Sequence, residues 1–185
     1  VSEAYRTLRT NIQFSSIDKK VKTIVVTSAN MSEGKTTTVT NLAETFAQAG
    51  NRVMVVDADL RRPRVHKLFN LENQQGLTNV LAGQIELKQT IASACSDVHV
   101  MTSGPIPPNP SELLGSEKMK ELVRVLSEHY DIVLFDAPPV NLVTDAAILS
   151  TVVDGVILAV ASGKTDIEGG KRAMKLLQAV NANLL

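Results

Sequence analysis

Apolar residues along this chain follow two patterns that alternate from one end to the other. Short runs rich in β-branched residues are typical of buried strands, whereas apolar residues that recur every three or four positions are typical of helices. Runs of the first kind lie at Thr23–Thr27, Val53–Val56, Val98–Met101, Asp131–Phe135 and Gly155–Ala161. The helical pattern occupies Ser2–Phe14, the stretch after Thr36, Ser111–Tyr130 and Asp166–Val180, with short pieces at Val65–Phe69, Leu77–Leu81, Leu87–Ala92 and Thr144–Leu149.

This alternation predicts an α/β fold: a doubly wound, mainly parallel sheet with helices on both faces. The chain has 185 residues and shows no internal repeat or low-complexity stretch, so one domain is expected over residues 1–185. Gly50 is expected to end the second helix. In the last helix, Met174, Leu177 and Val180 are expected to face the sheet.

The first apolar strand leads into a loop that ends in Gly34-Lys35-Thr36 and then into a helix. This order of strand, loop and helix is that of a phosphate-binding loop for a nucleoside triphosphate. Backbone N–H groups and the helix N-terminus attract phosphate, Lys35 would reach the β- and γ-phosphates, and the Thr36 hydroxyl would bind Mg²⁺. Ala29 departs from the usual pattern because it stands where the first glycine is expected. The predicted nucleotide-binding residues are Ala29, Asn30, Met31, Ser32, Glu33, Gly34, Lys35, Thr36 and Thr37.

Acidic residues follow two of the predicted strands. Asp57 and Asp59 come directly after Val53–Val56, and Asp136 follows Phe135. Because ligands of open α/β sheets sit at the carboxyl ends of the strands, these carboxylates are expected near the phosphate loop. One of a pair spaced i,i+2 could lie near a metal ion and the other near an acceptor hydroxyl. The residues alone therefore predict a Mg²⁺-dependent domain that uses ATP or GTP.

Composition narrows the class of protein further. Hydrophobic residues make up 44% and charged residues 21%, with a net charge of zero and a pI near 7.0, so bulk charge gives no argument for nucleic acid or an anionic membrane. Cys95 is the only cysteine, which excludes intrachain disulfides and fits a reducing cytosol. No apolar run reaches the roughly 18 residues of a membrane span.

The first predicted helix, residues 2–14 with Ser2 as a plausible N-cap, carries Glu3, Arg6 and Arg9 at intervals of three. The spacing alone is typical of a solvated face with one i,i+3 ion pair. The alternative is a charged surface for self-association.

The chain resembles the bacterial tyrosine kinases of the capsule and exopolysaccharide type. The resemblance rests on the phosphate loop Ala29–Thr36, the motif D-x-D-x-R in Val53–Arg61, the apolar strand with its aspartate in Ile132–Pro139, the stretch Thr102–Leu114 and E-x-x-R-x-x-R at residues 3–9. It implies ATP and Mg²⁺ as cofactors, Lys35 on the phosphates, and Thr36, Asp59 and Asp136 around the metal. It also implies that Asp57 is the base that takes the proton of the acceptor tyrosine.

The same resemblance implies partners. Glu3, Arg6 and Arg9 would form the interface of a ring-shaped homo-oligomer, an octamer, and a membrane protein with a cytosolic tail would activate the kinase. The protein would then be cytoplasmic, at the inner face of the cell membrane, with tyrosine-containing proteins as substrates, autophosphorylation between subunits, a role in polysaccharide synthesis and export, and no nucleic acid. The family's C-terminal tyrosine cluster is absent from these 185 residues, whose only tyrosines are Tyr5 and Tyr130.

Two other functions remain open at this stage. Partitioning and septum-positioning ATPases share the general fold and dimerise on ATP, but they carry a signature lysine where this chain has Asn30. A catalytically idle subunit that only senses nucleotide is the other possibility, and the four residues Lys35, Asp57, Asp59 and Asp136 argue against it.

Overall fold

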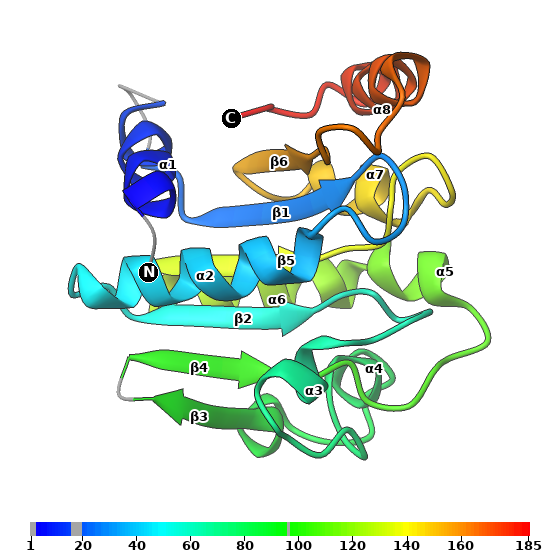
Figure 1. The fold of residues 1–185 in the computed structure, drawn as a ribbon. Helices are drawn as coiled ribbons and strands as arrows, with labels where there is room; N and C mark the ends of the chain where they lie inside the picture. Colours follow the sequence, from blue (N-terminus) through cyan, green and yellow to red (C-terminus); the bar gives the residue numbers. More distant parts are fainter. Residues whose placement is uncertain (1–2, 16–19, 96) are drawn as a thin grey trace.

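The computed structural model describes residues 3–15, 20–95 and 97–185 of the chain, and it is built around a six-stranded sheet of order β3-β4-β2-β5-β1-β6 (Figure 1). Only the pair β3–β4 is antiparallel, and the other neighbouring strands are parallel. The mainly parallel sheet expected from the sequence is therefore confirmed. Its strands are β1 (Thr23–Ser28), β2 (Val53–Asp57), β3 (Ile91–Cys95), β4 (Val98–Met101), β5 (Ile132–Asp136) and β6 (Gly155–Ala159).

Helices cover both faces of this sheet, as the alternation of elements predicts. In Figure 1, α2 crosses in front of the sheet and α6 lies behind it. One face carries α1 (Glu3–Phe14), α2 (Lys35–Gln48) and α3 (Val65–Leu68). The other carries α4 (Leu77–Leu81), the short 3₁₀ helix η1 (Leu87–Thr90), α5 (Pro110–Leu114), α6 (Glu117–His129), α7 (Asp145–Ser150) and α8 (Ile167–Ala179).

The central strands are buried on both sides because two apolar cores enclose them. Successive side chains of a strand point to opposite faces. Accordingly, Val25 packs in one core, whereas Ile24 and Val26 pack in the other with Phe46 of α2. All six residues of β1 are buried. This double covering explains why the strand sequences read as continuous apolar runs.

Residues 87–92, predicted to be helical, are helical only in part. The helix ends at Thr90, and Ile91–Cys95 forms the edge strand β3. The sequence pattern misses this strand because the four residues after Ile91 are small and none of its residues is buried, so neither a β-branched run nor an apolar alternation marks it. The strand exists because β4 supplies an antiparallel partner.

The single helix predicted over Ser111–Tyr130 is two helices. α5 ends at Leu114, with Gly115 as its C-cap residue, and the Ser116 side chain caps α6 by accepting a hydrogen bond from the N–H of Met119 at 3.2 Å. Serine competes for backbone donors in this way, which favours a new helix start over continuation. Asn109 precedes α5 as its N-cap residue, with Pro110 at the first helical position.

The buried face of α8 also differs from the prediction. Leu177 is buried as expected, but its partner in the core is Ala173, while Met174 is 45% exposed and Val180 is half-buried. Gly50 ends α2 as predicted, with φ of 82° and an N–H donated to Ala47. The predicted cap Ser2 lies outside the described residues. None of the helices described here is long and apolar enough to cross a bilayer.

Candidate nucleotide site

The loop between β1 and α2 has the backbone of a phosphate cradle. Gly34 precedes α2 with φ of 85°, in the left-handed region that favours glycine, and Ser32 is also left-handed with φ of 59°. Ala29 is fully buried and is not among the residues with positive φ, so the missing glycine imposes no strain there. Backbone N–H groups at the start of α2 are thus free to face an anion.

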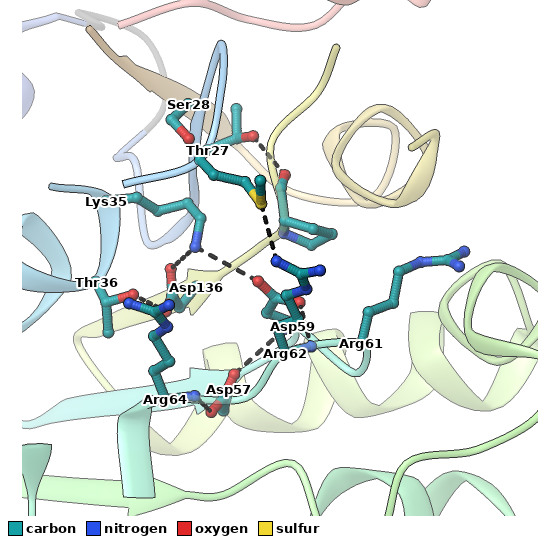
Figure 2. Close-up of polar contacts among 12 residues, drawn as sticks. Thr27, Ser28, Lys35, Thr36, Asp57, Asp59, Arg61, Arg62, Arg64 and Asp136 are labelled. Atoms are coloured by element: carbon teal, nitrogen blue, oxygen red, sulfur yellow. Dashed lines mark hydrogen bonds and ion pairs between the residues drawn. The ribbon is translucent and has the colours of Figure 1, made fainter. Parts of the chain in front are cut away.

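Lys35 and Thr36 meet two of the predicted aspartates (Figure 2). The Lys35 Nζ lies 3.3 Å from Asp136 Oδ1 and 3.6 Å from Asp59 Oδ2. The Thr36 hydroxyl donates a 2.7 Å hydrogen bond to Asp136 Oδ2. Burial raises the pKa of Asp136, while the charge of Lys35 opposes that rise.

The sheet register explains why these groups converge. Asp57 and Asp136 end neighbouring parallel strands and are paired in register, and the Ala58 N–H donates to the Asp136 carbonyl at 2.9 Å. β5 in turn pairs with β1, whose end begins the phosphate loop. The residues of the site therefore lie together at the carboxyl ends of three adjacent strands, as the sequence predicts.

Asp57 is fully buried, and backbone N–H groups bind both of its carboxylate oxygens. Its Oδ2 accepts hydrogen bonds from the N–H groups of Arg64 at 3.0 Å and Val65 at 2.9 Å, and its Oδ1 accepts a longer 3.3 Å bond from Asp59. Burial, followed by the nearby charge of Asp136, raises the pKa of Asp57 to about 7. The carboxylate therefore anchors the loop 58–64 that follows β2.

A pocket of about 770 Å³ opens beside these groups. The residues that line it include Asp59 and the rest of the phosphate loop but not Ala29, Asn30, Asp57 or Asp136. Asn30 donates its N–H to Glu33 Oε2 at 2.8 Å. The lining residues are Met31, Ser32, Glu33, Gly34, Lys35, Thr36, Thr37, Asp59, Arg61, Arg62, Arg64, Lys67, Leu68, Pro138, Pro139, Leu142 and Val143.

Sequence reasoning missed the partners of Arg61. Figure 2 shows its side chain pointing away from Lys35, and its guanidinium binds the fully buried carboxylate of Asp145 and the hydroxyl of Ser111. No local pattern marks Asp145, which lies within the helix expected over Thr144–Leu149. The contact joins residues 84 positions apart, so only the tertiary structure brings it together.

The three residues of E-x-x-R-x-x-R occupy different environments. Glu3 and Arg6 form an exposed ion pair at 3.1 Å, whereas the Arg9 Nη1 donates to the Thr45 carbonyl of α2 at 3.1 Å. Arg9 therefore holds α1 against α2 within the chain, and Glu3 and Arg6 remain accessible.

Residues 21–184 match the AAA domain family. Over 185 residues the chain is 50% identical to the tyrosine-protein kinase YwqD of Bacillus subtilis (strain 168), covering 100% of this chain and 78% of that protein. The chain belongs to the bacterial tyrosine-protein kinases. It is also 36% identical over 183 residues to the tyrosine-protein kinase etk of Escherichia coli (strain K12), which is 98% of this chain and 25% of that protein.

The solved structures agree with this family. The kinase domain of Escherichia coli tyrosine kinase ETK superimposes with a TM-score of 0.94 at 35% identity, covering 98% of this chain and 72% of that one. These matches favour the kinase over the partitioning-type switch. A more distant structure, cobyrinic acid a,c-diamide synthase from Mycobacterium smegmatis with bound ADP and magnesium, shares only the fold, with a TM-score of 0.75, 18% identity, and coverage of 88% of this chain and 70% of that one.

Proposed function

We propose that this kinase transfers the γ-phosphoryl group of Mg²⁺-bound ATP to a tyrosine of another polypeptide, which can be a second copy of the kinase. This phosphorylation would regulate the synthesis and export of a capsular or exocellular polysaccharide. One observation carries the catalytic part: Lys35 lies within 4 Å of two carboxylates from different strands, beside a pocket that the phosphate loop lines. Capsule-linked relatives support the regulatory part.

The residues at this site fit a magnesium ion. Asp136 Oδ1 is buried and accepts no hydrogen bond, with only the Lys35 ammonium beside it at 3.3 Å among the described residues. The neighbouring oxygens of Thr36 and Asp59 are the hard donors that Mg²⁺ prefers. In the described part of the chain, no three acidic, histidine or cysteine side chains are arranged to hold a metal by themselves. We therefore assign Thr36, Asp59 and Asp136 to the ion, with phosphate and water supplying its other ligands. The bound ion would neutralise charge on the phosphates.

The chain's own groups divide the rest of the work. Lys35 and the N–H groups at the start of α2 hold the phosphates of ATP and stabilise charge as it moves onto the leaving oxygen. A bond forms between the tyrosine oxygen and the γ-phosphorus, the bond from that phosphorus to the β–γ bridging oxygen breaks, and ADP leaves. The tyrosine proton passes to Asp57.

The pKa of Asp57 suits the role of base, but its burial means that a tyrosine can reach it only after a movement of the protein. A pKa of about 7 lies near the working pH of a general base. Because Oδ2 is committed to two N–H groups, Oδ1 is the oxygen available for the proton. The side chain is fully buried, so the loop 58–64 must move for a tyrosine to reach it.

Neither tyrosine of residues 1–185 lies where it could accept the phosphoryl group. Tyr130 is buried and its hydroxyl lies 2.7 Å from His99 Nδ1. Tyr5 is half-buried on α1 and packs against the core on the α2 face. Neither residue lines the pocket.

Assembly and location complete the proposal. The exposed pair Glu3 and Arg6 supports a role for α1 in a ring-shaped homo-oligomer, an octamer, with Arg9 fixing the helix that presents them. A membrane protein with a cytosolic tail would activate the kinase and hold it at the inner face of the cell membrane.

The test is incubation with Mg²⁺-ATP and a tyrosine-containing peptide, in the presence and absence of the cytosolic tail of a candidate activator, with phosphotyrosine read by mass spectrometry. Phosphotyrosine that requires Lys35 and Asp57 would support the proposal. Hydrolysis of ATP without phosphotyrosine under any of these conditions would refute it and favour a nucleotide-driven switch.

A further inference from the structure

The tripeptide Gly-Lys-Thr occurs twice in this chain, at residues 34–36 and 163–165. The second copy also lies between a strand, β6, and a helix, α8. It is not a second phosphate cradle, because α8 begins only at Ile167 and Asp166 is its N-cap residue, whose carboxylate accepts the Gly169 N–H at 2.6 Å. The second Gly-Lys-Thr therefore has a different role.

Both functional side chains of this second copy bind the phosphate loop. The Lys164 Nζ donates a 2.9 Å hydrogen bond to the carbonyl of Ser32. The Thr165 hydroxyl donates to Oε1 of Glu33. Each contact joins residues 132 positions apart, so the turn after β6 straps the phosphate loop from outside the nucleotide motif.

Thr165 and both carboxylate oxygens of Glu33 take part in hydrogen bonds at this contact. Thr165 accepts the Ala161 N–H at 2.9 Å while it donates to Glu33, and the other oxygen of Glu33 accepts the Asn30 N–H at 2.8 Å. Glu33 is only 7% exposed although it belongs to a loop that receives phosphate. Its negative charge is thus held by donors from two segments.

Lys164 and Thr165 contact the part of the phosphate loop that includes the left-handed residue Ser32. Ser32 has φ of 59°, a left-handed conformation that residues with a Cβ rarely adopt. Such a conformation persists only where surrounding contacts fix it. From outside the loop, Lys164 contacts the Ser32 carbonyl and Thr165 contacts the side chain of the next residue, Glu33.

We propose that Thr165 and Lys164 are positioning residues for nucleotide binding, because they hold Glu33 and Ser32 in the conformation that turns the N–H groups of the loop toward the ATP phosphates. This inference rests on the proposed function of the pocket. Neither residue lines that pocket, so both act through the phosphate loop and not by touching the nucleotide.

Affinity for Mg²⁺-ATP, measured by isothermal titration calorimetry on the whole chain, tests this role. Thr165→Val keeps the shape of the side chain and removes the hydroxyl, and it should weaken binding roughly tenfold, the size expected for a hydrogen bond to a charged group. Thr165→Ser should restore affinity to within about twofold. Thr151→Val is the matched control, because that exposed threonine bonds only the Ile148 carbonyl. Lys164→Met is an independent second variant that should also weaken binding.

The turnover number at saturating ATP should change by less than about twofold in Thr165→Val, since the reacting groups are untouched. A purely structural role would lower the melting temperature without moving the dissociation constant of the folded protein. Unchanged affinity in both Thr165→Val and Lys164→Met, or a Thr165→Ser variant as weak as Thr165→Val, would overturn the inference while the wild type still binds. Failure of the wild type to bind Mg²⁺-ATP would overturn the proposed function itself, and this inference with it.

Discussion

Arg61 binds Asp145 through two parallel hydrogen bonds, from Nε to Oδ2 at 2.9 Å and from Nη2 to Oδ1 at 3.1 Å. The Asp145 side chain is fully buried, and the Ser111 hydroxyl also donates to its Oδ1 at 2.7 Å. The pair ties the loop after β2 to the first turn of α7. The arginine of the D-x-D-x-R motif therefore fixes the position of the loop that carries Asp59.

Arg61→Met should lower the free energy of unfolding by roughly 2–3 kcal/mol, because it leaves a buried carboxylate without its cation, and solvent screening of the partly exposed arginine moderates the loss. Urea denaturation measures this change. Arg61→Met combined with Asp145→Leu should recover part of the stability, since no unpaired charge then remains. A double variant that loses the sum of the two single losses would show that the pair is not coupled.

Lys35→Met should lower the rate of tyrosine phosphorylation by about 10²–10³-fold, because it removes a preorganised positive charge from the phosphates. The measurement is the initial rate of phosphotyrosine formation by mass spectrometry. Lys88→Met, which alters an exposed lysine on η1, is the control and should leave the rate unchanged. Equal rates in the two variants would exclude Lys35 from phosphoryl transfer.

Two substitutions at Asp57 should separate its anchoring role from its role as a base. Asp57→Ala leaves the N–H groups of Arg64 and Val65 buried without an acceptor, and it should cost about 1–3 kcal/mol of stability as well as phosphorylation. Asp57→Asn keeps one acceptor oxygen for those N–H groups but cannot take a proton. It should therefore remain within about 1 kcal/mol of the wild type in urea denaturation and still lose phosphorylation. Phosphorylation retained by Asp57→Asn would reduce Asp57 to an anchor.

The residues of α1 should respond differently to substitution. Glu3→Ala with Arg6→Ala should reduce assembly seen by light scattering and leave the melting temperature nearly unchanged, because an exposed i,i+3 pair contributes only about 0.3–0.5 kcal/mol. Arg9→Ala should instead lower the melting temperature, since it removes the bond from α1 to the Thr45 carbonyl. Assembly that persists in the double variant would place the interface elsewhere.

Acid should weaken the junction between β2 and β5. The Arg52 N–H, which donates to Asp131 at 2.8 Å, lowers the pKa of that carboxyl below its usual value of 3.8. The unfolded chain then binds the proton first as the pH falls, so this contribution to stability is present above pH 3.8 and is lost as the pH drops through the folded pKa. The stability difference between wild type and Asp131→Asn should shrink from pH 7 to pH 3 in urea denaturation. A difference that stays constant across this range would contradict the assignment.

Much of the candidate site was predictable because its signals are local. Gly34, Lys35 and Thr36 must be consecutive to form a cradle at a helix start, and Asp57 and Asp136 each end an apolar run. In contrast, the edge strand β3 and the break at Ser116 were not predicted. The first depends on a partner strand and the second on a competition between a cap and helix continuation.

The amino-acid sequence by itself determined the α/β fold, the phosphate loop and the three strand-end aspartates, because strand burial, glycine conformations and acidic residues at strand ends are written in neighbouring positions. Only the tertiary structure decided which N–H groups bind each oxygen of Asp57 and that Arg61 binds Asp145. It also decided that Lys164 and Thr165 donate hydrogen bonds to the phosphate loop. The contacts of Arg61 and those of Lys164 and Thr165 join segments that follow different strands, and the pairing of parallel strands, which no local pattern encodes, sets which segments meet.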